Sequence, residues 1–274
     1  MAMPIPLHTT KPAAVKHGKK ITISLDSLQS LKSRDTPYDY KQYKFEPEDW
    51  LQAAEDGFTD WEGTLEAELN KVIRENLPSP LPEHVTLAFS GKFKELHLKE
   101  NTYKLLTYRS VSTEFVDSSR DCTLSPAEVA SSFFDCLRFE LRSFQEEFEI
   151  PFALDFSGLK GAEGATFKSG VHLDLLEYVI LPNGITELAD DCFSFAKNLK
   201  SITLPKSITK IGDYCFEKSG LESITLHEGI TEIGEHFCDQ VPNLKSIVLP
   251  EGITKIGTES FYYCENLKSI TLPE

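Results

Sequence analysis

From Leu176 onward the sequence repeats itself with a period of 22 or 23 residues, and this feature constrains the fold more than any other. The clearest units share the order Leu-x-Ser-Ile-x-Leu, then Ile-Thr-x-Ile-Gly, then a pair of Cys and Phe. Units begin at Leu176, Leu199, Leu221, Leu244 and Leu267. The array therefore contains four full units and a partial fifth. A unit this short cannot bury its own apolar side chains, so stacked neighbours have to cover them, and the repeat predicts a solenoid.

The spacing inside one unit predicts its local structure. Ile202 and Leu204 lie two residues apart, as on one face of a β-strand, and Pro205 ends that strand. Ile208 and Ile211 then turn a second short segment toward the core. We expect the Cys-Phe pair to fill the far side of each coil.

These motifs resemble the BspA-like leucine-rich-repeat family, whose mark is L-x-S-I-x-L-P followed by I-T-x-I-G and C-F. The resemblance covers residues 176–274. It implies a leucine-rich-repeat fold and a role in adhesion or protein interaction. The family carries no catalytic residues, so the resemblance transfers none and implies no cofactor. Many members of the family are secreted surface proteins.

Charged residues recur at two outward positions of the repeats, and their signs alternate along most of each column. The first column is Glu177, Lys200, Glu222, Lys245 and Lys268, and the second is Glu187, Lys210, Glu232 and Lys255. Stacked strands lie about 4.8 Å apart, so most of these charges face an opposite neighbour. Two interpretations of this pattern are self-neutralising charge ladders, which fix the register of the coils, and a charged docking site. The alternation of sign favours the ladders.

The least polar outward residues are Tyr178 and Ile180 in the first unit. The next two units hold Ser201, Thr203, Ser223 and Thr225 in the same columns. We therefore predict that a protein partner binds this face, with its apolar anchor at the N-terminal end of the solenoid. The predicted partner-binding residues are Tyr178, Ile180, Lys200, Thr203, Glu222, Thr225 and Lys245.

Residues 21–150 are predicted to form an α+β domain, so that the fold class is an α+β N-terminal domain followed by a C-terminal leucine-rich-repeat solenoid. Helices are predicted over 47–56, from the capping box at Thr59 to Pro78, and from the cap at Ser125 over about six turns. Apolar alternation predicts an antiparallel meander with strands near 85–89, 96–98, 103–108 and 111–116, and a turn at 90–91. We recognise no family in this part of the chain.

The two remaining segments flank that domain. Residues 1–20 have the composition of a flexible basic tail, and residues 151–175 form a junction or capping segment. Phe152, Leu154 and Phe156 alternate there like a strand that begins the solenoid. The glycines of this junction do not make a phosphate loop, because no Gly-Lys-Ser/Thr sequence follows them.

The composition of the chain argues against several classes of function. The net charge is −15, and no basic stripe stands against it, so we expect no nucleic-acid partner. No run of 18 apolar residues predicts a membrane span. None of the 6 cysteines forms a C-x-x-C pair, and Cys192, Cys215 and Cys238 fall at or beside one repeating position, which indicates core packing. A reducing, cytoplasmic location fits best, and the alternative is export by a route that needs no signal peptide.

Candidate catalytic chemistry is sparse. Cys136 falls to one side of the apolar stripe of its predicted helix, and His84, His97 or His172 would have to serve as its base. No catalytic signature flanks Cys136, so packing is the favoured role. The histidines fit no metal-ligand spacing, and we predict no metal site.

Three functions remain in order of support. The leading one is a non-enzymatic protein-interaction module. The second is a bacterial effector whose N-terminal domain acts on a host target that the repeats select, and the third is a hydrolase that uses Cys136. At the C-terminal edge three outcomes stay open: a longer repeat array, a two-fold homodimer, or shielding by Tyr262, Tyr263 and Cys264.

Overall fold

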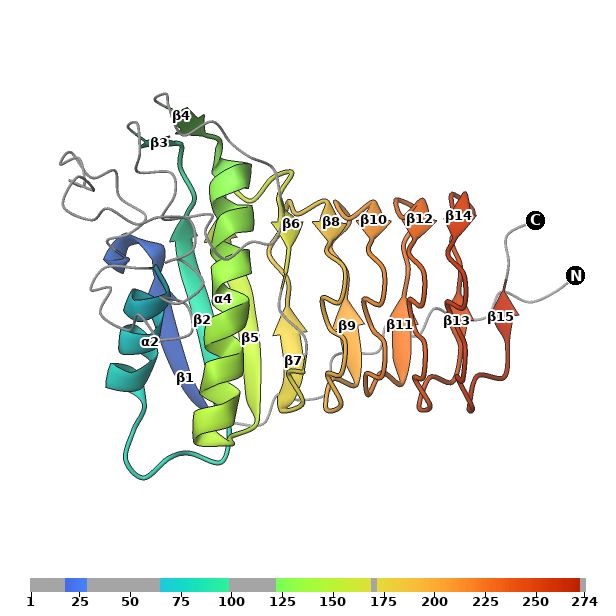
Figure 1. Cartoon of the computed structure of the whole chain (residues 1–274), viewed down its shortest axis with the longest axis horizontal. Helices are drawn as coiled ribbons and strands as arrows, with labels where there is room; N and C mark the ends of the chain where they lie inside the picture. The colour runs from blue at the N-terminus through green and yellow to red at the C-terminus, as the bar shows by residue number, and fades with distance from the viewer. Residues whose placement is uncertain (1–17, 29–64, 99–121, 169–171, 272–274) are drawn as a thin grey trace, which may run out of the picture.

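The computed structural model describes residues 18–28, 65–98, 122–168 and 172–271 (Figure 1). These residues form an elongated molecule with one parallel sheet along its length. Two helices lie over the N-terminal end of this sheet, and the repeats continue it as stacked coils. None of the helices in these ranges is both long enough and apolar enough to cross a membrane.

The main sheet joins the N-terminal part and the repeats without a break. Its strand order is β1-β2-β5-β7-β9-β11. The strands are β1 (Lys19–Ser24), β2 (Val85–Lys92), β5 (Phe152–Lys160), β7 (Leu176–Ile180), β9 (Ser201–Thr203) and β11 (Ser223–Thr225). All neighbours in it pair in parallel. The short strands β13 (Ile247–Val248) and β15 (Ile270–Thr271) pair in the same way beyond β11.

A second layer covers one face of this sheet. Its N-terminal part is helical, with α2 (Leu65–Asn76) and α4 (Pro126–Phe148), and a single 3-10 turn, η1 (Leu25–Ser27), follows β1. Its C-terminal part is a sheet with one short strand from each coil: β6 (Thr166–Phe167), β8 (Glu187–Leu188), β10 (Lys210–Ile211), β12 (Glu232–Ile233) and β14 (Lys255–Ile256). Helix α4 lies beside β6, so helices and strands share one layer (Figure 1).

The predicted antiparallel meander is wrong for its first strand. Strand β2 is parallel to both β1 and β5, and it runs through Gly91 to Lys92 where a turn was expected. Alternation of apolar residues marks a strand but does not encode its direction, and the long helix α4 supplies the crossover that parallel pairing needs. Antiparallel pairing occurs between β3 (Leu96–Leu98) and β4 (Cys122–Leu124). The strands expected over 103–108 and 111–116 and the helix over 47–56 lie outside the described residues.

Two predicted helices are confirmed. The Ser125 side chain accepts the amide of Glu128 while the Glu128 carboxylate accepts the amide of Ser125, so the predicted capping box starts α4. Helix α4 ends at Phe148, with Glu149 in the left-handed conformation. Helix α2 follows the predicted spacing as far as Asn76, and residues 59–64 before it lie outside the described ranges.

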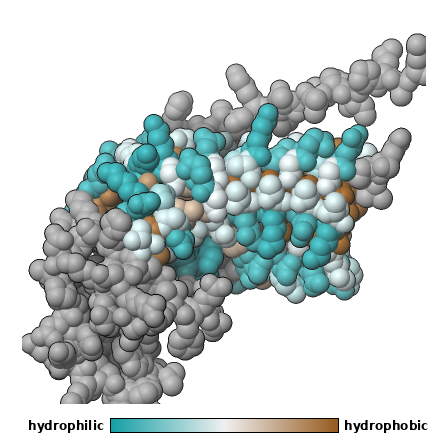
Figure 2. Space-filling view, turned by 90° about the horizontal axis from the view of Figure 1, so that it is seen from above, coloured by the Kyte–Doolittle hydropathy of each residue, from teal (hydrophilic) through white to brown (hydrophobic). Residues whose placement is uncertain are grey.

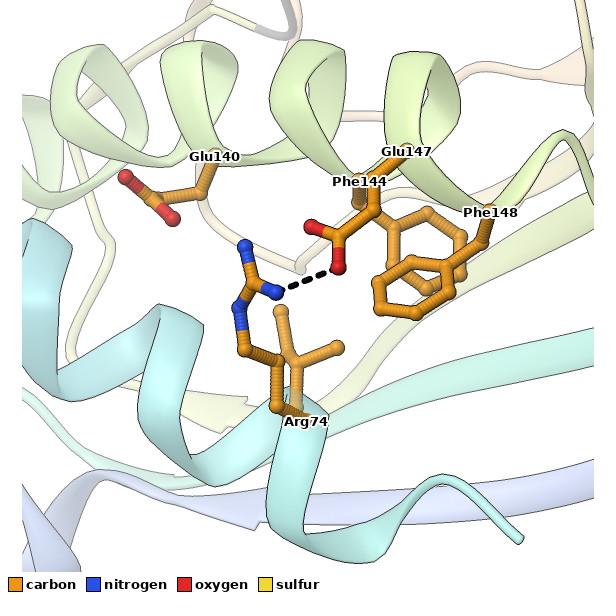
Figure 3. A pocket seen from close by; sticks show the side chains of 6 residues that line it. Arg74, Glu140, Phe144, Glu147 and Phe148 are labelled. Atoms are coloured by element: carbon orange, nitrogen blue, oxygen red, sulfur yellow. Dashed lines mark hydrogen bonds and ion pairs between the residues drawn. The ribbon is translucent and has the colours of Figure 1, made fainter. Parts of the chain in front are cut away.

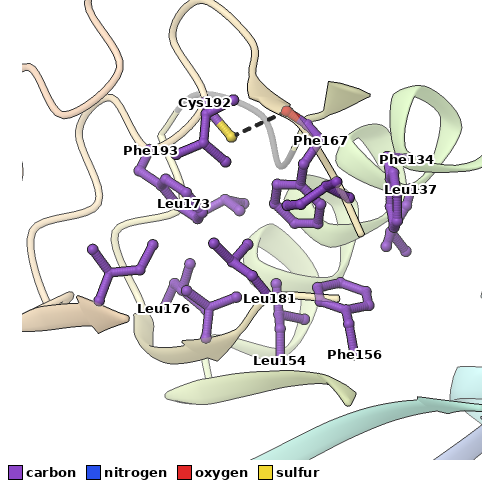
Figure 4. Packing of buried hydrophobic residues seen from close by; sticks show 14 of the residues in the cluster. Phe134, Leu137, Leu154, Phe156, Phe167, Leu173, Leu176, Leu181, Cys192 and Phe193 are labelled. Carbon is purple, nitrogen blue, oxygen red and sulfur yellow. Dashed lines mark hydrogen bonds between the residues drawn. The ribbon is translucent and has the colours of Figure 1, made fainter. Parts of the chain in front are cut away.

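The apolar stripe of α4 packs into a core that continues through the repeats (Figure 4). The Phe134 ring lies 5.8 Å from that of Phe156 on β5 and 4.8 Å from that of Phe167 on β6. Phe167 in turn stacks at 6.1 Å on Phe193 of the first full coil. The N-terminal part therefore shares one core with the solenoid and covers its first coil.

Polar contacts complete this join. The backbone amide of Thr166 donates to the Ser131 hydroxyl of α4 at 3.1 Å, so α4 satisfies the outer edge of the second sheet. The Gln145 side chain donates to the carbonyl of His172 and accepts the amide of Leu175, both at 2.8 Å. The carboxylate of Asp135, which is buried, contacts Lys168 at 3.3 Å. Edge groups that would otherwise lack partners are thus paired by the helix.

Glycine lets successive coils stack closely. A Cβ atom on Gly212 would lie 2.4 Å from a carboxylate oxygen of Asp190, and one on Gly234 would lie 2.4 Å from that of Asp213. Those oxygens accept the amides of Asp213 and Glu235. The Ile-Gly step of the repeat is therefore a packing requirement between coils.

Candidate interaction surface

The side of the main sheet that faces away from α4 is the surface on which most of the predicted site residues lie. Leu154, Val179, Ile202 and Ile224 point inward and are buried, so their neighbours in sequence point outward. We call this surface the outer sheet face. It comprises Lys20, Thr22, Thr86, Ala153, Asp155, Tyr178, Ile180, Ser201, Thr203, Ser223 and Thr225.

Tyr178 and Ile180 lie in the middle of the outer sheet face. Tyr178 pairs in register with Ala153, and Ile180 pairs with Asp155 on one side and Thr203 on the other. Both side chains are half-buried. Tyr178 and Ile180 thus lie where the N-terminal part meets the repeats, and not at an end of the sheet.

Asp155, the register neighbour of Ile180, forms a cluster of polar contacts beside Tyr178 and Ile180. Its carboxylate accepts Lys20 Nζ at 2.9 Å, the Ser157 hydroxyl at 2.6 Å and the Ser157 amide at 3.0 Å. Burial alone would raise the pKa of this carboxyl group, but the bonds from Ser157 and Lys20 outweigh it, so the pKa is lowered. Burial and then the Asp155 charge raise the pKa of Tyr178, so this phenol stays protonated at neutral pH.

Sequence reasoning missed the pair of Lys20 and Asp155. Lys20 was assigned to the tail, whereas it lies on β1, and the two residues are 135 positions apart. The one available signal was an acidic residue that alternates with Leu154 and Phe156 in a strand. The sequence does not identify Lys20 as the cation that pairs with Asp155, because the two residues come together only when β1, β2 and β5 pair in parallel.

The expected charge ladders form in part. Lys245 Nζ lies 2.8 Å from the Glu222 carboxylate, and Lys210 Nζ lies 2.8 Å from that of Glu187. The bond from Lys245 lowers the pKa of Glu222, and the bond to Glu187 raises the pKa of Lys210. At the N-terminal end Glu177 contacts the ring of His84 at 3.2 Å. Glu222 and Lys245 were predicted to bind a partner, and in this structure they bind each other.

The repeat cysteines line the core, as predicted. Cys192, Cys215 and Cys238 are buried free thiols, and burial raises the pKa of Cys215 and Cys238 well above the usual range. Cys192 donates to the carbonyl of Phe167 at 3.5 Å. Cys264 is half-buried and donates to the carbonyl of Cys238 at 3.0 Å. The raised pKa values of Cys215 and Cys238 deprive these two thiols of the thiolate character that a nucleophile needs.

Cys136, the weak catalytic candidate, lies on α4, but its side chain is outside the described residues, as is that of His97. The two other proposed bases have partners of their own. His84 is buried against Glu177, and the ring of His172 stacks on Phe195 at 4.1 Å. Nothing in the described geometry therefore builds a Cys-His pair.

A shallow crevice lies between α2 and α4, where Arg74 points toward the Glu147 carboxylate and forms an ion pair with it (Figure 3). The ring of Phe148 lies 5.8 Å from the guanidinium carbon. The volume of the crevice is about 10 Å³, which is the space of one water molecule. This crevice joins the helices and is too small for a substrate.

On the face that Figure 2 shows, apolar residues gather at the C-terminal end of the repeats. Val248, Ile256 and Ile270 are 61%, 41% and 40% exposed. Tyr262 and Tyr263 pack against each other but remain 49% and 60% exposed, so the shielding expected of them is partial. Pairing of two copies at this edge stays a prediction.

The repeat geometry agrees with comparisons to known proteins. The profile described as "BspA type Leucine rich repeat region (6 copies)" matches residues 171–274. This stretch of the chain is similar to BspA-type leucine-rich-repeat regions. The match confirms the resemblance carried by the Leu-x-Ser-Ile and Ile-Thr-x-Ile-Gly motifs.

Two solved structures of leucine-rich-repeat proteins are similar to this chain. The T. pallidum protein is 26% identical, with a TM-score of 0.41 over 44% of this chain and 58% of its own. The Bacteroides ovatus protein is 27% identical, with a TM-score of 0.39 over 44% of this chain and 31% of its own. The chain thus spans less than two thirds of either protein. A comparison with curated proteins gives no match.

Proposed function

We propose that this protein binds a protein partner through its outer sheet face, with Tyr178 and Ile180 as the apolar anchor. The observation that carries the proposal is their position. They lie side by side on β7, half-buried, at the centre of a six-stranded sheet whose opposite face holds the core. The leucine-rich-repeat region supports a protein-interaction role for the surface as a whole.

The surroundings of the anchor have the composition of an interface. An apolar centre with a polar rim is the usual anatomy of a protein–protein contact. Here Thr203 and Thr225 continue the Ile180 row with hydroxyl groups, and Lys200 is exposed beside them. Full burial of a side chain such as Ile180 is worth about 1.5–3 kcal/mol, which is enough to make two such residues the main contributors to affinity.

Asp155 and Lys20 extend this surface onto the N-terminal part. Asp155 lies in the row of Ile180 and Lys20 in the row of Tyr178, and their ion pair at 2.9 Å joins the two rows. Both oxygens of Asp155 are already paired within the chain. We propose that Lys20 and Asp155 set the orientation in which the partner binds, and that Tyr178 and Ile180 supply most of the affinity. A partner would thus contact both parts of the sheet at once.

The test is capture of partners by the immobilised full chain, compared with a variant that carries Tyr178→Ser and Ile180→Ser. The control is Thr209→Ala with Thr231→Ala, two exposed residues on the second-layer side of the two following coils, next to β10 and β12. A protein held by the wild type and the control but lost from the anchor variant would support the proposal. Equal capture by all three folded proteins would contradict it, and circular dichroism melting establishes that each is folded.

A further inference from the structure

The carboxyl ends of β2 and β5, which lie side by side (Figure 1), bring two lysines together. Lys92 pairs in register with Lys160, so their side chains lie on the same face of the sheet. Their sequence neighbours Phe93 and Leu159 are buried in the core that α4 covers, so the two lysines project from the opposite face. Both lysines are exposed, and we call them the lysine pair.

Charged residues that pair in register on other described strands have opposite signs. Lys210 pairs with Glu187 and with Glu232. Glu232 pairs in turn with Lys255. Like charges that face each other across two strands destabilise a sheet, whereas opposite charges stabilise it. The lysine pair is the exception among the described strands, in a chain whose net charge is −15, and sheet stability gives no reason for it.

Neither ammonium group of the lysine pair is neutralised within the ranges that the structure describes. Asp155, the carboxylate on β5, is paired with Lys20 instead. The other acidic residues close in sequence, Asp26, Glu95 and Glu163, form no ion pair with either lysine. More distant carboxylates act weakly on the pair, because physiological salt screens charges beyond about 8 Å. The lysine pair is therefore a local cationic patch on an acidic molecule.

The lysine pair lies on the same side of the sheet as the outer sheet face, toward the carboxyl ends of its strands. Lys160 follows Asp155 by five residues on β5, and Asp155 is the register neighbour of Ile180. At about 3.3 Å per residue, the pair lies about 16 Å along the strands from the row of Ile180. A standard protein interface buries about 800 Å² on each partner, so one contact spans both places.

We propose that the protein partner of the outer sheet face carries an acidic segment whose carboxylates bind the lysine pair. This inference rests on the function proposed above and names the chemistry of the partner at one end of the contact. A carboxylate between two ammonium groups accepts a charge-assisted hydrogen bond from each and removes the repulsion between them. In an extended segment of the partner, the acidic residues lie about five positions from the apolar ones, since such a chain spans about 3.3 Å per residue.

The test is fluorescence anisotropy with the full chain and labelled peptides in which two glutamates and a Leu-Phe pair are separated by four serines, in both orders. The reference peptides carry glutamine in place of glutamate. Lys92→Gln with Lys160→Gln is expected to weaken binding of a glutamate peptide about three- to tenfold, because each exposed ion pair contributes modestly. Binding of the glutamine peptides should not change. Circular dichroism melting establishes that the variant is folded.

The matched control is Lys71→Gln with Lys255→Gln, which removes two exposed positive charges from the second layer. It is expected to change binding of the glutamate peptide by less than about twofold. Equal losses for the two double variants, or a wild type that does not prefer the glutamate peptide, would overturn the proposal. Tyr178→Ser with Ile180→Ser should weaken both peptides. If this variant binds the glutamate peptide as the wild type does, the outer sheet face fails as the anchor while the lysine pair stands.

Discussion

Thr166 on β6 and Ser131 on α4 are joined by a hydrogen bond of 3.1 Å in which the backbone amide of Thr166 donates to the hydroxyl. This bond closes the outer edge of the second sheet, where a solenoid otherwise exposes unpaired amides. The same hydroxyl donates to the carbonyl of Ala127 at 2.9 Å, so it is held in place by its own helix. Helix α4 therefore acts as the N-terminal cap of the repeats.

Ser131→Ala is expected to destabilise the protein by about 1–3 kcal/mol, because it leaves the half-buried amide of Thr166 without an acceptor. The measurement is urea unfolding of the full chain. Ser132→Ala, one position along the same helix, is the matched control and should change the free energy of unfolding by less than about 0.5 kcal/mol. Equal effects of the two variants would show that the bond to Thr166 contributes nothing.

Phe134→Ala and Leu141→Ala should each lower stability by about 2–5 kcal/mol, because both side chains are fully buried between α4 and the main sheet. Calorimetric melting measures this loss. If both variants melted as the wild type does and lost partner binding instead, the stripe of α4 would be a partner surface and the core described for it would be wrong.

Cys192→Ser and Cys215→Ser are each expected to cost about 1–3 kcal/mol, because a hydroxyl group replaces a thiol in an apolar core. In the native protein, a thiol reagent followed by peptide mapping should modify Cys264 well before Cys192, Cys215 or Cys238, since burial raises the pKa of Cys215 and Cys238 and hides all three. Rapid modification of Cys192 and Cys215 would contradict this assignment.

Asp191→Asn should raise the melting temperature at pH 7. The pKa of Asp191 is raised in the folded state, so its charged form opposes folding at any pH above that pKa. The gain from the substitution should therefore shrink as the pH falls through the folded pKa, and vanish well below the usual 3.8, where the carboxyl group is protonated in both states. A gain that is the same at pH 7 and pH 3 would exclude charge repulsion as its cause.

The repeat pattern predicts the solenoid because every coil buries the same columns. Ile202 and Ile224 pair in register, Ile247 is buried at the equivalent position of the next coil, and the spacing of all three can be read from the sequence alone. The capping box at Ser125 is equally local, since both of its partners lie within four residues. Contacts between neighbouring coils follow from the period, so the ladder partners Glu222 and Lys245 were identifiable as well.

What the sequence could not predict depends on contacts across the chain. Strand β1 joins β2 across more than 60 residues, and alternation of Ile21 with Ile23 does not indicate which strand it pairs with. The same holds for Lys20 and Asp155, and for Gln145, whose side chain reaches the junction at Leu175. The stacked rings of Tyr214 and His236 escaped notice because the two residues lie between core residues, where no periodic signal marks an outward side chain.

Site-specific photo-crosslinking tests the central claim, that a protein partner binds the outer sheet face, most directly. A benzoylphenylalanine is placed at residue 180 on this face, at residue 203 beside it, or at residue 210 on the opposite layer as the control. The account predicts the same crosslinked partner from positions 180 and 203 and none from 210. A partner captured from 210 and from neither of the other two positions would contradict it.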